Sequence, residues 1–405
     1  MPTDLETHPG PVEFDPFSDE YFNDPTATYA RLRDEAPVYF NEHYGFYALS
    51  RFDDVASASL DWGTYSSEYG IDLATLRRRK HLGMDMIIMM DPPKHDRMRA
   101  LVSRVFTPRA IGALEPMIRE VITGYADQVD ATAGFDAVAD FSAPFPVEII
   151  SRMLGVPEGD RQQIRHWLDV SLHREHGNPE PTQEGITAML NSVAYFQELI
   201  AEKRTNPDDD MLSRLTQVEV DRGDGSMTGL TDDEIAGFAT LLGGAGAETV
   251  TKLVGNAAVL FARHPDQWNK VLADRSLIAP AVEEVLRYHP PSQYQGRFTV
   301  KESERHGVTI PAGYPIILIT GAATRDDRHY DEPNRFEIER PASLSLGFGY
   351  GIHSCVGAAL ARMESRIAFE LMAERWPRFE IDESGLRRVN MSNVAGYSSV
   401  PLSAA

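Results

Sequence analysis

Apolar residues recur at every third or fourth position through the middle of the chain, between residues 107 and 263. This spacing predicts a series of helices, each with one apolar face. Stretches with glycine and proline near residues 155–159, 177–181 and 222–229 interrupt the pattern and predict the connections between helices. Helices packed against one another are therefore expected to form most of the core.

The longest predicted helix begins at Thr231. The sequence Thr231-Asp-Asp-Glu234 has the form of a capping box, in which a threonine and the glutamate three residues later satisfy each other's backbone N–H groups. The helical pattern then runs without proline to Arg263, just before His264-Pro265. At about 1.5 Å per residue this helix would be about 50 Å long, enough to cross the whole molecule.

Short strands are predicted on both sides of this helical part. Residues 38–40 and 46–49 flank a turn and predict a β-hairpin. After the long helix, a proline-started helix at residues 280–288 is followed by short β-like pieces. These pieces lie at residues 297–300, 308–310 and 316–320.

The first 25 residues are polar and contain several proline and aspartate residues, which predicts a flexible arm leading into a helix at residues 25–35. The remaining sequence has no internal repeat and no linker that would divide it. We therefore expect a mainly α fold with small β-sheets, of the α+β class, in a single domain over residues 26–405.

The chain of 405 residues has 61 acidic and 39 basic side chains and a formal net charge of −22. This balance argues against a general nucleic-acid-binding protein, which needs a basic face. The longest nearly apolar run, residues 313–323, falls short of the roughly 20 residues that a membrane span needs. The N-terminal sequence also lacks a basic-then-apolar secretion signal. A cytoplasmic protein without a membrane or nucleic-acid partner is expected.

Cys355 is the only cysteine, which excludes an intrachain disulfide and a cysteine-rich zinc site. It lies in the sequence Phe-Gly-Tyr-Gly-Ile-His-Ser-Cys-Val-Gly at residues 348–357, before an amphipathic helix. A cysteine at a helix start would have the pKa of its thiol lowered by free backbone N–H groups. The surrounding glycines would let a flat, bulky partner approach the sulfur.

Three interpretations of this loop are open. A buried structural cysteine is the usual role of a lone cysteine, but it explains neither the glycines nor the helix start. A nucleophilic thiol paired with His353 is disfavoured, because two side chains so close in a tight loop usually point in different directions. A thiolate ligand of a metal ion accounts for all the features. Without a second cysteine, the metal would bring its other ligands, as haem iron does.

The loop at residues 348–357 resembles the haem-binding loop of the cytochrome P450 family, Phe-Gly-x-Gly-x-His-x-Cys-x-Gly. Other signatures of the family occur in the expected order, so the resemblance covers nearly the whole chain from about residue 38 onward. It implies a cytochrome P450 fold with the long helix crossing the haem, haem b as the cofactor and Cys355 as the iron ligand. Phe348 and Gly357 would contact the haem within the loop.

The long helix contains the sequence Leu-Leu-Gly-Gly-Ala-Gly-Ala-Glu-Thr-Val at residues 241–250. Each glycine there costs about 0.8–1.0 kcal/mol relative to alanine, and close helix packing is one explanation. The family pattern Ala-Gly-x-Glu-Thr matches residues 245–249 and implies a helix loosened beside the iron, with Ala245 at the haem. Thr249 would hydrogen-bond dioxygen or a water, and Glu248 would help pass protons from solvent. A bond from Thr249 back to a carbonyl one turn earlier is compatible with this role.

The resemblance also provides partners for the haem propionates, which need cationic or N–H groups once they leave water. His95 and Arg99 match the family's His-x-x-x-Arg, and Arg297 and His353 match its other propionate contacts. By spacing alone, His95 and Arg99 would form a solvated helix face.

Glu284 and Arg287 match the family's Glu-x-x-Arg, and at this spacing both side chains lie on one helix face. Exposed pairs of this kind contribute little to stability. The resemblance implies instead that the two are buried with Arg340 and stabilise the fold behind the haem.

Residues 94–109 contain five Lys or Arg and one Asp within an acidic chain. Apart from Arg99, the resemblance places these charges and Arg362 where an acidic ferredoxin would dock. Electrons would come from NAD(P)H through a ferredoxin reductase and the ferredoxin, because the chain has no nucleotide-binding signature and nothing resembling a fused flavin domain.

The family places a variable loop over the substrate at residues 62–90, which here contains Met84 and an apolar run at residues 86–90. Methionine adapts to irregular apolar shapes, although apolar runs are normally core. The basic run at residues 77–80 could attract an acidic substrate, but a solvated run is the simpler interpretation. The expected pocket residues are Met86, Ile88, Gly244, Gln293, Gln295 and Val394.

These features favour a haem-thiolate monooxygenase that inserts one atom of O2 into an apolar or amphipathic small molecule and reduces the other to water. Three alternatives stay open. A peroxide-driven peroxygenase usually lacks the acid and alcohol pair, and a thiol-dependent hydrolase would be colourless. A haem-based sensor or ligand-binding protein would bind ligands without forming an oxygenated product.

Overall fold

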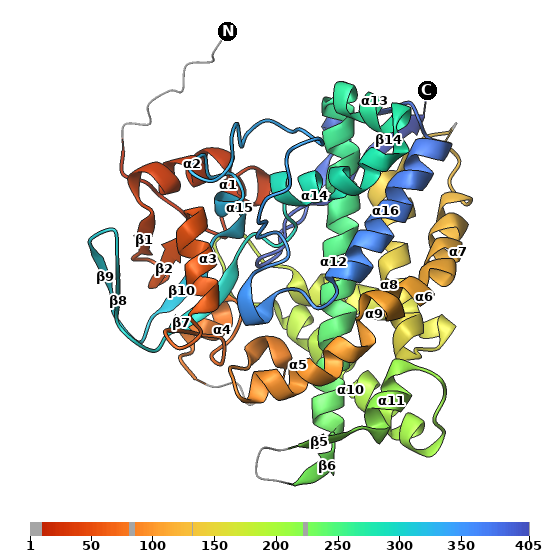
Figure 1. The fold of residues 1–405 in the computed structure, drawn as a ribbon, viewed down its shortest axis with the longest axis horizontal. Coiled ribbons are helices and arrows are strands. Elements are labelled where there is room, and N and C mark those ends of the chain that lie inside the picture. The colour runs from red at the N-terminus through yellow and green to blue at the C-terminus, as the bar shows by residue number, and fades with distance from the viewer. Residues whose placement is uncertain (1–9, 81–85, 132, 222–225, 405) are drawn as a thin grey trace.

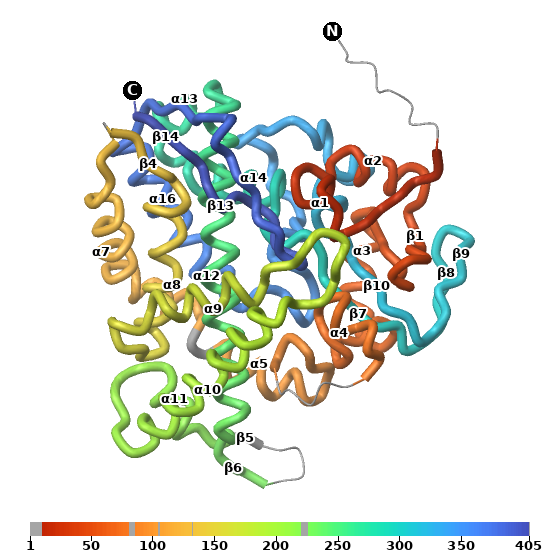
Figure 2. Tube along the Cα trace, turned by 180° about the vertical axis from the view of Figure 1, so that it is seen from behind, coloured from red at the N-terminus to blue at the C-terminus, as the bar shows by residue number. Residues whose placement is uncertain are grey.

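The structure is a computed structural model that describes residues 10–80, 86–131, 133–221 and 226–404. Helix α12 (Asp232–Arg263) runs through the middle of the molecule (Figure 1). Most of the other long helices lie on one side of it, and the largest sheet and the N-terminal helices lie on the other, as the view from behind also shows (Figure 2). The expected α+β architecture is confirmed. Met84, expected in the loop over the substrate, lies outside the described residues.

The predicted capping box begins α12. The Thr231 hydroxyl accepts a hydrogen bond from the Glu234 N–H at 3.2 Å, and the Glu234 carboxylate accepts one from the Thr231 N–H at 2.8 Å. The helix ends at Arg263, and Pro265 starts the next helix, α13 (Pro265–Ala273). The prediction of a long central helix is therefore confirmed at both ends.

Several helices pack directly on α12, among them α8 (Pro144–Leu154), α9 (Arg161–Leu172), α10 (Gln183–Thr205) and α16 (Ala358–Arg375). Their apolar side chains join those of α7 (Glu115–Ala126) and α14 (Ile278–Tyr288) in one hydrophobic core. This core is what the helical spacing of apolar residues predicts, because each helix buries one apolar face.

The other α-helices of the described chain have at most 12 residues. They are α1 (Asp19–Asn23), α2 (Thr26–Glu35), α3 (Phe52–Leu60), α4 (Leu73–Arg77), α5 (Lys94–Val105), α6 (Pro108–Ala113), α11 (Met211–Gln217) and α15 (Thr320–Ala323). No helix in the described ranges is both long and apolar enough to cross a membrane.

The largest sheet has the strand order β1-β2-β10-β7-β3. Its strands are β1 (Val38–Asn41), β2 (Phe46–Leu49), β3 (Tyr65–Ser66), β7 (Gln295–Thr299) and β10 (Pro315–Leu318). The predicted hairpin is β1 and β2, with Val38 opposite Leu49. Strand β10 runs parallel to β2 and antiparallel to β7.

Both faces of β10 are covered, which explains why it is a continuous apolar run. Ile317 packs in a cluster with Tyr29 and Leu32 of α2, whereas Ile316 and Leu318 pack in a cluster with side chains of α3. The sheet is therefore packed between α2 on one face and α3 on the other.

The remaining strands form small sheets of two or three strands. They are β4 (Phe135–Asp136), β5 (Glu219–Asp221), β6 (Met227–Gly229), β8 (Ser303–Arg305), β9 (Val308–Ile310), β11 (Phe379–Ile381), β12 (Arg387–Arg388), β13 (Tyr397–Ser399) and β14 (Pro401–Ala404).

Several predicted boundaries differ from the structure by one or two residues, and two of these differences have a clear physical reason. The helix expected at residues 280–288 begins earlier, at Ile278, because proline is tolerated in the first turn of a helix, where N–H groups have no intrahelical partner. The strand expected at residues 316–320 ends at Leu318, and the small residues that follow form α15.

The expectation of a flexible arm over the first 25 residues is wrong from residue 10 onward. Phe14 and Phe17 are buried, at 3% and 1% exposure, and pack with Tyr29, Tyr44 and Phe46. Helix α1 then follows. Composition suggested a solvated tail, but burial of its aromatic side chains fixes this segment against the sheet.

Replacing Phe17 by alanine is expected to lower the free energy of unfolding by about 3–5 kcal/mol, because a buried aromatic side chain leaves a cavity. Denaturant unfolding measures the loss. The matched control is Phe40→Ala, since Phe40 is 39% exposed and should cost much less. Equal losses in the two variants would contradict the packed N-terminal segment.

Candidate functional site

The loop before α16 folds back on itself around Cys355. The Cys355 N–H donates to the carbonyl of Phe348 at 2.8 Å, after a short 3-10 turn at Gly351–His353. Helix α16 begins at Ala358 with Gly357 as its N-cap. The expectation that Cys355 itself starts the helix is therefore wrong, since it lies two residues before the cap.

Glycines allow this loop to pack closely. Gly349 and Gly351 have φ angles of +69° and +74°, in the left-handed region that disfavours other residues. A Cβ at Gly351 would lie 2.5 Å from the carbonyl oxygen of Ser59 in α3, so the close approach itself requires glycine. A Cβ at Gly357 would lie 3.9 Å from the Cys355 Sγ, which is ordinary contact. The first two glycines shape the loop, and Gly357 leaves room beside the sulfur.

The Cys355 side chain is exposed, yet it lies among enough protein that burial raises the pKa of its thiol. A hydrogen bond from the Gly357 N–H to the sulfur and the charges of Arg99 and Arg362 act to lower that pKa. The expected lowering by the helix end is wrong for the free thiol, because burial outweighs these effects. A coordinated metal ion would deprotonate the thiol outright.

Cationic and imidazole side chains gather beside this loop in a group that we call the cationic cluster: His95, Arg99, Arg297 and His353. The rings of His95 and His353 lie 4.6 Å apart between centroids. Burial, followed by the charges of Arg297, His95 and Arg99, lowers the pKa of His353 to about 2. These residues come from α5, β7 and the cysteine loop, and the structure brings all four together.

Two carboxylates of the described chain lie near the cationic cluster: Asp96, 3.1 Å from His95 Nδ1 and largely exposed, and Asp91, which faces Arg297. The buried Nε2 atoms of His95 and His353 have no hydrogen-bond partner among the described residues. Arg297 donates to the carbonyl of Gly296 at 2.7 Å. Burial lowers its pKa to about 10. Such a group suits a ligand that brings its own carboxylates.

The glycine-rich turn of α12 has two explanations that apply to different residues. A Cβ at Gly244 would lie 3.1 Å from the Leu168 side chain of α9, so close helix packing accounts for this glycine. A Cβ at Gly246 would make only ordinary contact with Ile150, at 3.6 Å. Ala245 is exposed although it lies in the middle of the central helix. The Thr249 hydroxyl donates to the Ala245 carbonyl at 2.8 Å, which is the backbone bond expected for a helical threonine.

Glu248 is buried next to Thr249 and has two partners that the sequence analysis missed. Its carboxylate lies 3.1 Å from Lys252 Nζ and is hydrogen-bonded to Asp169 of α9. Lys252 could have been found from its i, i+4 spacing. Asp169 could not, because nothing in the sequence pairs α9 with this turn of α12.

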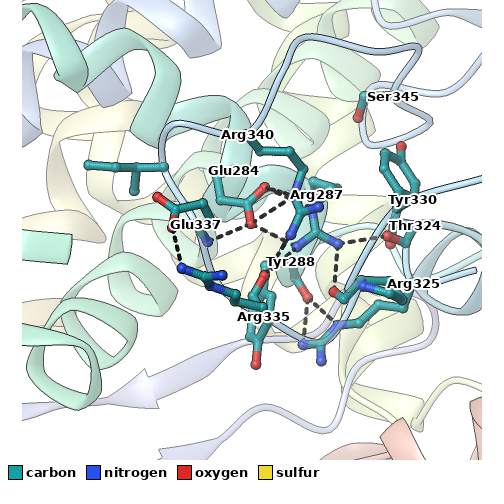
Figure 3. A network of polar contacts seen from close by, with 12 residues as sticks. Glu284, Arg287, Tyr288, Thr324, Arg325, Tyr330, Arg335, Glu337, Arg340 and Ser345 are labelled. Carbon is teal, nitrogen blue, oxygen red and sulfur yellow. Dashed lines mark hydrogen bonds and ion pairs between the residues drawn. The ribbon is translucent and has the colours of Figure 1, made fainter. Parts of the chain in front are cut away.

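Glu284 and Arg287 of α14 form the buried ion pair that the resemblance implies, and Arg340 joins it (Figure 3). Arg287 Nε and Nη2 donate to the Glu284 carboxylate at 2.7 and 2.8 Å, and Arg340 Nε lies 3.3 Å from it. Arg287 Nη1 reaches the carbonyls of Thr324 and Pro333 at 3.0 and 2.9 Å. The network ties α14 to the segment that leads into the cysteine loop.

One of the residues expected to line a substrate pocket, Gln293, makes contacts that stabilise the fold. Its amide donates to the Pro290 carbonyl at 2.6 Å, and its oxygen accepts from the Tyr29 hydroxyl at 3.0 Å. Its side chain joins the loop before β7 to α2, so it has a structural role, and its place in the substrate pocket stays a prediction. A buried amide needs such partners, and here the fold provides them.

The other expected pocket residues are compatible with a pocket. Gln295 bonds Ser292 and Thr320 at 3.1 and 2.7 Å, and Val394 pairs with Ser292 in an isolated β-bridge. Met86 and Ile88 are partly exposed around the short turn Ile87–Met89. That turn precedes Met90, whose backbone is hydrogen-bonded to His353, so it lies beside the cationic cluster.

Comparison with known proteins identifies the family of this chain. A family model described as "Cytochrome P450" matches residues 177–394. The chain belongs to the cytochrome P450 family. Cytochrome P450 123 of Mycobacterium tuberculosis is 40% identical over 391 residues, which cover 96% of each chain. The cytochrome P450 fold and the monooxygenase class follow, and haem b is the cofactor of this family.

Solved cytochrome P450 structures have the same fold. CYP109E1 from Bacillus megaterium in complex with testosterone is 32% identical, with a TM-score of 0.86 over 95% of this chain and 98% of that one. A mutant of P450 EryK in complex with erythromycin B is 34% identical, with a TM-score of 0.84 over 93% and 95%.

The residues of this cytochrome P450 fit haem b. Cys355 offers one sulfur ligand beside an open glycine, and no group of three or more His, Cys, Asp and Glu in the described chain could hold a metal ion by itself. The cationic cluster would hold the propionates, with Arg297 and the two free imidazole nitrogens as donors. The chain would thus provide one sulfur ligand and the counter-charges, and the porphyrin would provide the remaining ligands.

Replacing Arg287 by alanine is expected to cost about 3–5 kcal/mol of stability, because the buried Glu284 carboxylate would lose its two short hydrogen bonds and keep only the longer contact with Arg340. The control is Arg214→Ala, since the pair of Arg214 with Asp209 is exposed and worth at most about 1 kcal/mol. Denaturant unfolding of both variants provides the comparison. Similar losses would contradict a stabilising role for the buried network.

Proposed function

We propose that this cytochrome P450 uses O2 and electrons from a ferredoxin to oxidise an amphipathic molecule of about steroid or macrolide size. One observation carries the O2-dependent reaction: Glu248 is held in a buried ion pair next to Thr249, on the helix that has exposed Ala245 in its middle. A peroxygenase needs no such proton-handling pair, because peroxide brings its own protons.

The side chains divide the reaction into separate tasks. When bound, the haem supplies the centre at which O2 is reduced and one oxygen atom is transferred, and the Cys355 thiolate increases electron density there. Thr249 holds a proton donor at the reacting oxygen, and Glu248 replaces that proton from inside the protein. The cationic cluster neutralises the propionates and keeps the cofactor in one orientation.

The substrate class rests on similarity and on the side chains expected around it. Related structures contain testosterone and erythromycin B, which combine large apolar frames with polar groups. In this chain, Met86, Ile88 and Val394 offer apolar contacts, whereas Gln295 and Ser292 form a polar patch. A ligand with both kinds of surface suits these residues better than a pure hydrocarbon.

The proposed electron donor is an acidic ferredoxin with an NAD(P)H-dependent reductase. Arg97 is partly exposed on α5, and Arg109 is exposed on α6. Arg362 lies over the Phe348 ring at 4.5 Å and pairs with Glu283 at 2.5 Å, close to the sulfur. Basic residues on this side of Cys355 would steer a negatively charged partner to the short path for electrons.

The proposed function is tested by product analysis with the purified protein, a surrogate ferredoxin and reductase, NAD(P)H and labelled O2. A panel of steroids, macrolides, terpenes, fatty acids and aromatic acids provides the substrates. We expect a product carrying one labelled oxygen atom from at least one steroid or macrolide. Product from peroxide alone would favour the peroxygenase, and spectral binding without any product would favour a ligand-binding protein.

Thr249→Ala is expected to reduce product formed per NAD(P)H by roughly 10- to 100-fold while O2 consumption continues, because a hydrogen bond to a charged group is worth about 1.5–3 kcal/mol. Peroxide would accumulate instead of product. Thr249→Ser keeps the hydroxyl and should retain most of the coupling. An alanine variant as well coupled as the wild type would show that Thr249 has no part in proton delivery.

Neutralising Arg97, Arg104 and Arg109 together with glutamine is expected to lower ferredoxin-dependent turnover several-fold at low salt, with the difference fading as salt screens the charges. Substrate binding, followed by absorption, should be unchanged. Unchanged ferredoxin turnover at low salt would remove the support for docking at this surface.

A further inference from the structure

A second carboxyl group lies against Glu248 in the interior. Asp169 on α9 is hydrogen-bonded to Glu248 on α12, and Lys252 Nζ lies 3.1 Å from Glu248 Oε2. The two helices are in direct contact one turn away, where Leu168 packs on Gly244. The three groups therefore form a buried triad of two carboxyls and one amine, held by the packing of α9 on α12.

Burial and the contact between the two carboxyl groups favour a shared proton in the triad. Two ionised carboxylates in contact repel each other, and one ammonium group can neutralise only one of them. Glu248 and Lys252 are 3% and 4% exposed, so solvent cannot screen the excess charge. The cations that face the pair are Lys252 from α12 and Arg165 from α9. At Asp169, burial and the contact with Glu248 outweigh these two charges, so one carboxyl of the pair holds a proton near neutral pH.

The proton resides on Asp169. Burial, followed by contact with Glu248, raises the pKa of Asp169 to about 8. Burial also acts to raise the pKa of Glu248, but Lys252 and the hydrogen bond from Asp169 together lower it. Near pH 7 the pair is therefore a neutral Asp169 donating to a charged Glu248.

The position of Asp169 connects the triad with solvent. Asp169 is partly exposed, whereas Glu248 is buried. Thr249, the next residue after Glu248, carries the hydroxyl to which we assign the final proton donation. A proton that travels from solvent to the reacting oxygen can thus pass through Asp169 before it reaches Glu248.

We propose that Asp169 is the residue that recharges Glu248 with protons, with Lys252 fixing the Glu248 carboxylate between transfers. This role rests on the proposed function. In each transfer the O–H bond of Asp169 breaks and an O–H bond of Glu248 forms. Asp169 then takes a proton from water, so no electrons move and no further reactant is needed. Asp169 acts through Glu248 and is a positioning residue in this sense.

The first test is the infrared absorption of protonated carboxyl groups in the purified protein, followed from about pH 6 to about pH 10. We expect the wild type to lose one such band with a midpoint at about pH 8. Asp169→Asn should lack this band, and the exposed control Glu158→Gln should keep it. Glu364, another buried carboxyl with a raised pKa, should contribute an unchanged band to every variant and serves as an internal reference.

The second test compares two ways of driving the enzyme. Asp169→Asn should lower O2-driven product formation about 10-fold, below the 10²–10⁴ range of direct proton donors because water can partly replace the relay. Product formation driven by hydrogen peroxide should stay within about two-fold, since peroxide already carries its protons. O2-driven turnover of the wild type should fall as pH rises through about 8, as Asp169 loses its proton, and the asparagine variant should lose this dependence. Asp169→Glu should restore activity.

Two results would overturn the role of Asp169: a carboxyl band that persists in Asp169→Asn, or equal losses of O2-driven and peroxide-driven product. The infrared measurement requires no turnover. A wild type that binds haem but forms no product by either route would instead contradict the proposed function, so the two failures can be told apart.

Discussion

The exposure of one sulfur atom inside the fold is the constraint on which the rest of the structure depends. Cys355 is kept there by a loop that turns back on itself through its bond to Phe348 and presses onto α3 through Gly351. The free thiol gains nothing from this position, because burial raises its pKa. A metal ion at the sulfur would deprotonate the thiol, and the cationic cluster suits a ligand that carries carboxylates. Haem b would meet both requirements at once.

Helix α12 combines mechanical and chemical tasks in one element. Its capping box and its packing on α8, α9, α10 and α16 make it the support of the helical core. The same helix accommodates weak helix formers beside Thr249 and a charged Glu248 in its interior. Tertiary packing offsets the low helix propensity of the glycines and the burial of the Glu248 charge, since most helical stability in proteins comes from packing and not from propensity.

The sequence was informative where the signal is local. The capping box at Thr231, the hairpin at Val38 and the Glu284–Arg287 pair all depend on residues a few positions apart, and all three are present. Contacts between distant segments were beyond its reach. Gln293 turned out to bond Tyr29, the aromatic residues before α1 turned out to be buried, and Asp169 turned out to meet Glu248 across two helices. The single-domain boundary at residue 26 stays a prediction.

The most direct test of the account is the absorption spectrum of the ferrous carbonyl complex of the wild type beside Cys355→His. Histidine still offers an axial ligand, so haem can stay bound while the thiolate is removed. We expect the main band of the wild type at clearly longer wavelength and a shift of that band in the variant. An identical band in both proteins, or a wild type that takes up no haem, would contradict Cys355 as the iron ligand.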